Sequence, residues 1–556
     1  MTASPPVLSA ASSPLSPAFS LAHLALLALV VLVTAIGYRP DEFHFTTDET
    51  RHAVTGLFFR DALADRPFAN PRQYAFEYYA KYPALGIPHW PPFYYFVEGA
   101  FFLLFGISIL SARLSILLFA LLAAYFWQRL AATQGPPRRA WFAALIFPMV
   151  PYIIVYERSV MLEMPYLALA LAAIYFWVRF LETERGLYVW LVGGFATLAF
   201  LTSQKALFLP ILVGLHFLME RKFRLLKRWD VWAALALSSA AVVPWYLFTF
   251  RSLALSYERV IGESSAYLAI LPVLTYYWDR LPWQMGAVLF CLCIPGILWA
   301  LVRAPRQHRF FLLWVLSCYA TFTWVREKDL RHTMIWIPPL VYFSVLAVEA
   351  LFAHRRWALV ATGGLCLTLF VNALELDRRR LVGVEAAARW VSAQDESEVV
   401  YYQGALNGNF IFWMRKYDPE KKRLIAREKQ FVATQIVAGY GRREMMKSPE
   451  EILNFFRTWG IRYALVENRE AIPELSRARA FFQSSHFELV QAFPISVNET
   501  VGVEGPSRRD ADMKILVYRF RGTLQRSSAG VSIPMMTLRS DIPVRLDRLA
   551  GRPWPN

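Results

Sequence analysis

Long apolar runs alternate with short polar turns from the N-terminus to about residue 375. The first run extends from Leu21 to Gly37, and later runs of roughly 16–22 residues could each cross about 30 Å of hydrocarbon at 1.5 Å per residue. The later runs are centred near Leu118, Leu145, Ala170, Gly194, Leu212, Ser238, Cys293, Leu316, Val341 and Leu365. This pattern predicts an α-helical polytopic membrane domain over residues 1–375, with about eleven transmembrane helices.

The apolar segment from Pro91 to Gly106 does not fit this alternation. It begins with a proline pair, contains Glu98 and is only about 16 residues long. If it crossed the bilayer, the basic turns that follow would move from the cytoplasmic side to the outer side, against the usual bias. We therefore predict an interfacial helix in the first outer loop.

Lys and Arg residues gather at every second turn, and short cytoplasmic loops are enriched in these residues. The basic turns contain Arg129/Arg138/Arg139, Arg179/Arg185, Arg221/Lys222/Arg224/Lys227/Arg228, Arg303/Arg306/Arg309 and Arg355/Arg356. With these turns inside, the alternate turns lie outside, at residues 39–90, 156–163, 203–205, 251–283 and 326–331. The chain after Leu374 is then also outside.

Beyond residue 375, charged residues become frequent and no further run is long enough to span. Residues 376–521 are predicted to form a small extracytoplasmic α/β domain, and residues 522–556, rich in Ser, Arg and Pro, a loosely ordered tail. The expected strands are 399–402, 410–414, 463–466 and 514–518, and the expected helices are 384–391 and 449–459.

Composition supports a membrane protein. Of the 556 residues, 56% are hydrophobic and 18% charged, which excludes disorder, a collagen repeat and a small disulfide scaffold. The net charge of +17 is placed at the turns between spans, so it indicates membrane topology rather than nucleic-acid binding. The four cysteines lie in apolar runs without a His or Cys at metal-ligand spacing.

Asp48 and Glu49 open an amphipathic helix directly after the first span. A structural explanation is available, because Thr46 and Glu49 have the spacing of a capping box and acidic residues suit a helix N-terminus. Their location favours a role in the active site, since a lipid-linked substrate would present its head group at the membrane surface, directly after the first span.

Several motifs occur in order on the predicted outer side, and together they resemble the polyprenyl-phosphate-sugar-dependent glycosyltransferases of the GT-C superfamily. This group includes the dolichyl-phosphate-mannose-protein mannosyltransferases and the lipid A aminoarabinose transferase. The resemblance covers roughly residues 20–375. Its motifs are Asp48-Glu49, Pro91-Pro92-Phe93-Tyr94-Tyr95, Ser111-Ala112-Arg113-Leu114, Met161-Leu162-Glu163-Met164-Pro165, Leu201-Thr202-Ser203-Gln204-Lys205 and Arg331-His332.

The resemblance implies transfer of a sugar, with inversion, from a polyprenyl-phosphate donor to a lipid, glycan or protein acceptor. Asp48 is our candidate general base, with Glu49 and Glu163 as further acidic residues of the site. Lys205 and Arg331 are candidates to bind the donor phosphate. Two alternatives stay open: Glu163 could simply favour a helix N-terminus, and Arg331 could reach to the membrane interface together with Arg326 and Lys328.

His89 stands where many relatives carry an acidic residue before the proline pair. A neutral imidazole could bind a divalent metal there, whereas an interfacial stack of His89 on Trp90 is the alternative. The cofactor is therefore unknown, with a divalent metal left open.

Other protein classes compete with this interpretation. A polytopic transporter would carry its ionisable residues near the bilayer midplane, whereas most charges here lie at the ends of spans. An O-antigen-ligase or polymerase type of enzyme would rely on a large late outer loop rather than an acidic pair after the first span. A non-catalytic scaffold whose outer domain binds glycan is the third alternative, and an outward cavity that joins Asp48, Glu163 and Lys205 would argue against all three. We expect a bacterial inner-membrane protein, while the sugar and acceptor are not defined by the sequence.

Overall fold

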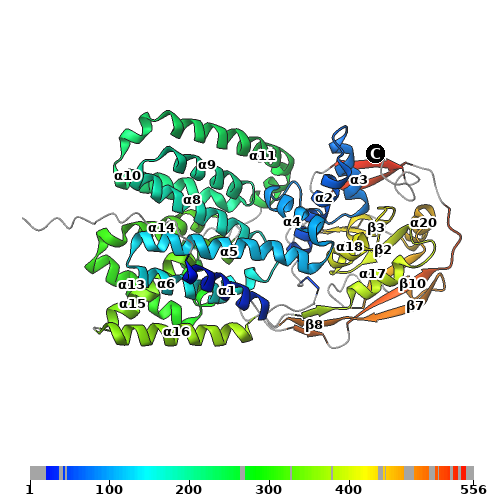
Figure 1. Cartoon of the computed structure of the whole chain (residues 1–556). Helices are drawn as coiled ribbons and strands as arrows, with labels where there is room; N and C mark the ends of the chain where they lie inside the picture. Colours follow the sequence, from blue (N-terminus) through cyan, green and yellow to red (C-terminus); the bar gives the residue numbers. More distant parts are fainter. Residues whose placement is uncertain are drawn as a thin grey trace, which may run out of the picture.

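The chain folds into a bundle of helices and a smaller domain built on a sheet (Figure 1). A computed structural model describes residues 20–36, 42–43, 47–262, 270–325, 328–352, 354–376, 380–435, 442–444, 446, 448–468, 481–499, 508–510, 513–525, 530–535 and 540–545. The predicted fold class is confirmed at this level, a mainly helical chain followed by a small α/β domain.

Sixteen helices in the described residues make up the bundle. They are α1 (Leu21–Ile36), α2 (Thr47–Asp65), α3 (Pro71–Lys81), α4 (Phe93–Phe105), α5 (Ile109–Gln134), α6 (Pro137–Ile146), α7 (Pro151–Glu157), α8 (Glu163–Thr183), α9 (Gly186–Phe200), α10 (Phe208–Glu220), α11 (Trp229–Gly262), α12 (Ile270–Met285), α13 (Ala287–Arg303), α14 (Pro305–Thr323), α15 (Ile337–Leu351) and α16 (Arg355–Glu375). Short 3-10 turns join some of them, namely η1 (Phe147–Met149), η2 (Gln204–Leu207), η3 (Phe223–Lys227) and η5 (Leu330–Trp336).

Within the described residues, 5 helical segments are long and apolar enough to cross a membrane. They are Ile109–Gln134, Glu163–Thr183, Trp229–Arg251, Leu330–Leu351 and Arg355–Glu375. The run predicted near Leu145 is broken into α6, η1 and α7, which bend by 61° and could together make a further crossing. Since other apolar helices are shorter, the count of about eleven crossings stays a prediction.

The helix predicted from Pro91 to Gly106 is α4, which ends before Gly106 at a φ of 79° that suits glycine. At 1.5 Å per residue it is about 20 Å long, too short to cross the hydrocarbon unaided. Glu98 is fully buried and turned toward α2, where a Cβ on Gly56 would lie 2.3 Å from its Oε2.

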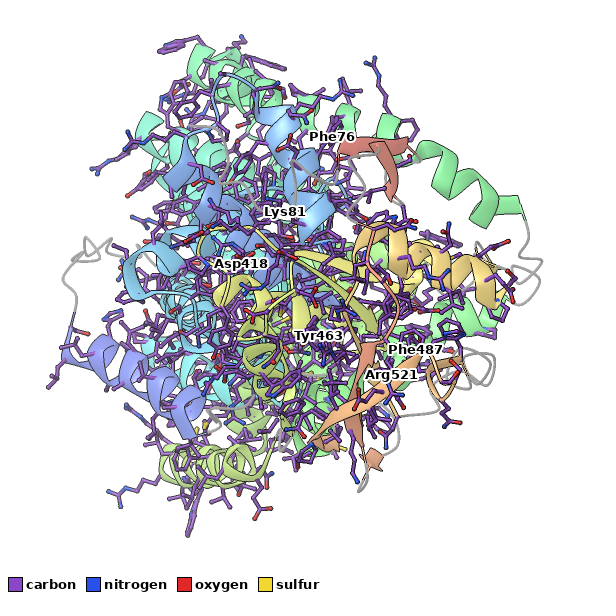
Figure 2. All side chains as sticks on the ribbon, turned by 90° about the vertical axis from the view of Figure 1, so that its right-hand side faces the viewer. Phe76, Lys81, Asp418, Tyr463, Phe487 and Arg521 are labelled. Carbon is purple, nitrogen blue, oxygen red and sulfur yellow. The ribbon has the colours of Figure 1, made fainter. Side chains whose placement is uncertain are left out.

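The C-terminal domain is centred on a five-stranded sheet in the order β3-β2-β6-β10-β7. β3 (Leu424–Arg427), β2 (Val399–Gln403) and β6 (Tyr463–Glu467) are parallel, whereas β10 (Lys514–Phe520) and β7 (Phe487–Pro494) are antiparallel to their neighbours. Figure 2 looks onto this domain and labels Tyr463, Phe487, and Lys81 and Asp418 where α3 meets the domain. Helices α17 (Val384–Ser392), α18 (Asn407–Lys416), α19 (Glu428–Phe431) and α20 (Pro449–Trp459) accompany the sheet.

The strand predicted at residues 410–414 is wrong, because these residues belong to α18. Every residue from Gly408 to Arg415 is buried, so the helix has no polar face within this stretch that would reveal a period of 3.6. A short apolar run that is buried on all sides shows the same hydrophobic pattern in a strand and in a helix.

The described part of residues 522–556, the predicted loosely ordered tail, contains two strands that the composition did not predict. β11 (Gly530–Met535) and β12 (Ser540–Arg545) form an antiparallel hairpin whose register pairs Val531 with Val544 and Ile533 with Ile542. Two smaller sheets complete the domain, β1 (Arg380–Val382) with β8 (Ser496–Glu499) and β9 (Arg508–Asp510), and β4 (Ala433–Gln435) with β5 (Arg442–Glu444).

Candidate active site

Helix α2 lies at the end of the bundle that faces the C-terminal domain (Figure 1), and Asp48 belongs to its first turn. Arg331 Nη1 donates to Asp48 Oδ2 at 3.1 Å, and the Asp48 side chain keeps 26% of its surface exposed. Arg331 comes from η5, where Asp329 Oδ1 accepts the backbone N–H of Arg331 and so caps the turn. The same guanidinium donates to Asp329 Oδ2 through Nε at 2.7 Å. Arg331 therefore bridges two carboxylates rather than pointing away toward the interface.

A second ion pair joins the two other predicted residues. Lys205 Nζ lies 2.5 Å from Glu163 Oε1, with only 15% and 4% of the side chains exposed. Glu163 is the first residue of α8, and Lys205 lies in η2 after α9, where the hydroxyl of Tyr166 on α8 also bonds its carbonyl. The structure therefore pairs Lys205 with a carboxylate, and its role in binding the donor phosphate stays a prediction.

The two pairs belong to one cluster. Arg331 lies close enough to Glu163 to interact with it electrostatically, and so does His52, one turn after Asp48 on α2. The segments around Lys205 and His89 also touch, since Gln204 Nε2 donates to the carbonyl of His89 at 3.2 Å. Four chain segments thus bring Asp48, Glu163, Lys205 and Arg331 together, as the predicted common side of their turns requires.

The charges of the cluster set its protonation. Burial would raise the pKa of Asp48, but His52 and the Arg331 guanidinium outweigh burial and hold that pKa below its usual range. Burial lowers the pKa of His52 to about 4, so its imidazole becomes charged only at the low pH where Asp48 itself titrates. Near pH 7 the imidazole is neutral, and Arg331 supplies the positive charge bonded to Asp48. Asp48 is consequently a carboxylate at neutral pH, the form that can accept a proton.

Glu49 lies differently from Asp48. It is fully buried, and its Oε1 accepts the backbone N–H of Val160 at 2.7 Å. This hydrogen bond links α2 to the turn before Glu163, so Glu49 helps to hold these two segments of the cluster together. Thr46, the other member of the predicted capping box, lies outside the described residues.

His89 packs edge-on against Trp90, with ring centroids 4.8 Å apart and an interplanar angle of 87°. Burial lowers the pKa of His89, which keeps its ring neutral. In the part of the chain that the structure describes, no group of three or more His, Cys, Asp or Glu residues could hold a metal ion. The residues around His89 therefore do not fit a metal centre, and metal dependence stays untested.

Sequence reasoning missed three features. Asp329 was not considered because its neighbours in the sequence are basic. Its position two residues before Arg331 is nevertheless the spacing of a side chain that caps a turn. His52 was overlooked, and its Nδ1 lies 2.7 Å from the hydroxyl of Tyr95. The third is Arg427, a cation of the C-terminal domain: burial lowers the pKa of Arg427 to about 10, and Arg51 of α2 lies close enough to lower that pKa as well.

Comparisons with known proteins agree with the predicted class. Residues 89–248 match the family model described as dolichyl-phosphate-mannose-protein mannosyltransferase. The structure of ArnT from Cupriavidus metallidurans bound to undecaprenyl phosphate is similar with a TM-score of 0.58 at 15% identity, over 91% of this chain and 99% of that chain. The apo form of that ArnT gives a TM-score of 0.57 over the same shares, also at 15% identity. A search of curated proteins by sequence finds no match.

The similarity to ArnT extends over the bundle and the C-terminal domain alike, so the whole fold is of this type. The family match lies on the segment that contains the motifs at residues 91–95, 161–165 and 201–205. The predicted resemblance is confirmed for the segment that the mannosyltransferase family model matches, and the fold as a whole is similar to that of ArnT.

Proposed function

We propose that the protein transfers a sugar, with inversion at the anomeric carbon, from a polyprenyl-phosphate donor to a hydroxyl or amine of a lipid, glycan or protein acceptor. The acceptor atom bonds to the anomeric carbon while the bond from that carbon to the phosphate oxygen breaks. The acceptor proton passes to Asp48, and the bonding electrons stay on the released polyprenyl phosphate. Undecaprenyl phosphate bound to the similar ArnT supports a donor of this chemistry.

The two ion pairs suggest how the donor engages the site. A phosphate arriving between Lys205 and Arg331 would share both cations, and its developing negative charge would be stabilised by groups already in place. When the phosphate also binds Arg331, the ion pair between Arg331 and Asp48 weakens. The pKa of Asp48 then rises, and the carboxylate becomes a better base while the donor is bound. Glu163, released in part from Lys205, can orient the acceptor.

The proposed topology has about eleven crossings in a bacterial inner membrane, with the site and the C-terminal domain extracytoplasmic. It is supported by the distribution of charge along the helices. α8 begins in the cluster at Glu163 and ends next to Arg185, and Arg138 and Arg139 at the start of α6 pair with Glu349 at the end of α15. The basic turns therefore gather away from the site.

The observation that carries the proposal is the pairing of two acidic residues with two cations from four separate segments. Its test is a transfer assay with the full-length protein in lipid vesicles, a panel of polyprenyl-phosphate sugars and a membrane extract as the acceptor source. We expect release of polyprenyl phosphate from at least one donor, and loss of this release in the Lys205→Met variant. Folded protein that cleaves none of the donors would refute the proposal, and movement of intact donor across the vesicle would favour a transporter.

A further inference from the structure

Helix α18 of the C-terminal domain lies along α2 and contacts it at two places. At the first, a Cβ on Gly408 would come within 2.0 Å of Thr50 Oγ1, two residues after Asp48. At the second, Arg415 Nε and Nη2 each donate to the carboxylate of Asp61 at 2.7 Å. Between them the ring of Phe412 packs edge-on against Phe43, at 4.8 Å between centroids.

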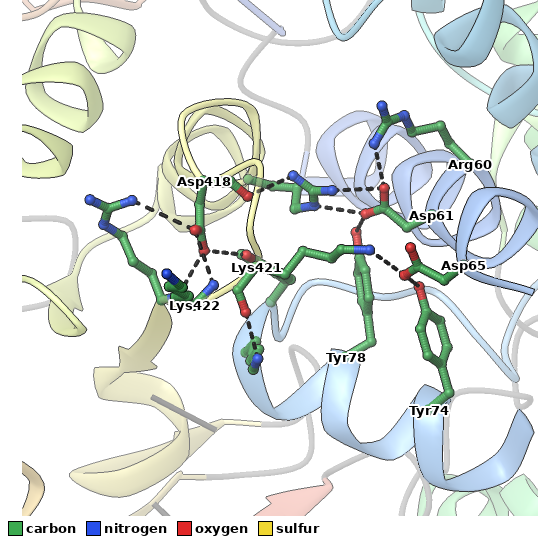
Figure 3. A network of polar contacts seen from close by, with 12 residues as sticks. Arg60, Asp61, Asp65, Tyr74, Tyr78, Asp418, Lys421 and Lys422 are labelled. Atoms are coloured by element: carbon green, nitrogen blue, oxygen red, sulfur yellow. Dashed lines mark hydrogen bonds and ion pairs between the residues drawn. The ribbon is translucent and has the colours of Figure 1, made fainter. Parts of the chain in front are cut away.

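The contact between Arg415 and Asp61 is a buried, two-point ion pair. The side chains are 1% and 0% exposed, and Tyr78 donates a third hydrogen bond to Asp61 at 2.8 Å (Figure 3). The guanidinium also donates to the carbonyl of Asp418 at 2.9 Å. Such a pair fixes geometry more than it adds stability, because burying two charges costs nearly as much as their attraction returns.

The start of α18 is equally constrained. Glu467, at the end of the central strand β6, accepts the backbone N–H groups of Leu406 at 2.6 Å and Ala405 at 3.0 Å. Gly404 adopts a φ of 153°, and a Cβ there would lie 2.1 Å from Glu467 Cδ. The sheet therefore sets the position of Gly408 against Thr50.

From these contacts we propose that α18 positions the catalytic helix, with Gly408 and Arg415 as positioning residues. Because α18 holds α2 near both ends, the C-terminal domain determines where Asp48 lies relative to Arg331. This inference rests on the proposed function for its kinetic consequence, but not for its structural one.

The first test replaces Arg415 with Lys, which keeps the charge and loses the two-point geometry. Arg462→Lys is the matched control, because Arg462 also pairs with a carboxylate at 2.7 Å, Glu396 within the C-terminal domain and away from α2. We expect amide hydrogen exchange at residues 51–55 to accelerate in Arg415→Lys and not in Arg462→Lys. Equal exchange in both variants would overturn the proposal, and this readout holds even if no sugar donor is ever found.

The second test places Ala at Gly408. In the transfer assay we expect kcat to fall at least ~10-fold with little change in the donor KM, because a small displacement of a reacting group is costly. The acid limb of the pH–rate profile should also move to higher pH as Asp48 separates from Arg331. Removing Thr50 Oγ1 by Thr50→Ala in the same chain should restore part of the rate.

The control for Gly408→Ala is Gly522→Ala, whose Cβ would meet Phe520 Cζ at 2.3 Å inside the C-terminal domain. Equal losses of rate in the two variants, without a shift of the pH profile, would show that overpacking acts only through the stability of the domain and would refute the positioning role. If wild-type protein turns over no donor, the proposed function fails while the hydrogen-exchange comparison still decides this inference.

Discussion

Asp48 combines partial exposure with a single hydrogen bond to a cation, which leaves carboxylate surface for an acceptor. Asp48→Asn keeps the size of the side chain and its place in the first turn of α2 but removes the proton acceptor. We expect kcat to fall by roughly 10²–10⁴-fold, with donor binding much less affected. Steady-state transfer and donor binding by the folded variant measure the two effects. A near wild-type rate would leave Asp48 only the favourable charge that it places in the first turn of α2.

The charge of Arg331 predicts the pH dependence of transfer. The pKa of Asp48 is held below its usual range despite burial, so lowering the pH from 7 to about 5 should leave Asp48 ionised. In Arg331→Gln the charge and the hydrogen bond of the guanidinium are lost, so the pKa of Asp48 should rise and the acid limb should move to higher pH. Arg331→Lys, which keeps the charge, should show a smaller shift. Identical acid limbs for all three proteins would exclude Asp48 as the titrating group.

At the scale of elements, the packing of α4 on α2 depends on Gly99. A Cβ there would lie 2.8 Å from the backbone nitrogen of Arg60 and 3.2 Å from the carbonyl oxygen of Gly56, and backbone atoms cannot rotate away. Gly99→Ala should therefore destabilise the protein by about 1–3 kcal/mol. Thermal unfolding in detergent measures the change, with Gly194→Ala as the control because a Cβ at Gly194 meets nothing within 4 Å. Equal melting temperatures for both variants would contradict the close contact.

Sequence patterns predicted correctly those elements that local composition or the alternation of turns defines. The apolar helices, the strands at residues 399–402 and 463–466 and the common side of Asp48 and Glu163 all follow from local composition and from the alternation of turns. The strand predicted for Phe410–Met414 failed because its burial comes from α2 and the sheet, which are remote in sequence. Asp329 and His52 were missed for a related reason, since their roles depend on partners that only the fold brings near.

For the whole molecule, the decisive prediction is its orientation in the membrane. Phe68, between α2 and α3, is 84% exposed on the side of the cluster, and Arg224, whose side chain is 73% exposed, lies among the basic turns at the other end. In a background without the four native cysteines, Phe68→Cys should react with an impermeant maleimide applied from outside. Arg224→Cys should react only after the membrane is opened, because basic turns stay in the cytoplasm. If both sites react from the same side, the inside assignment of the basic turns fails, and with it the extracytoplasmic placement of the active site.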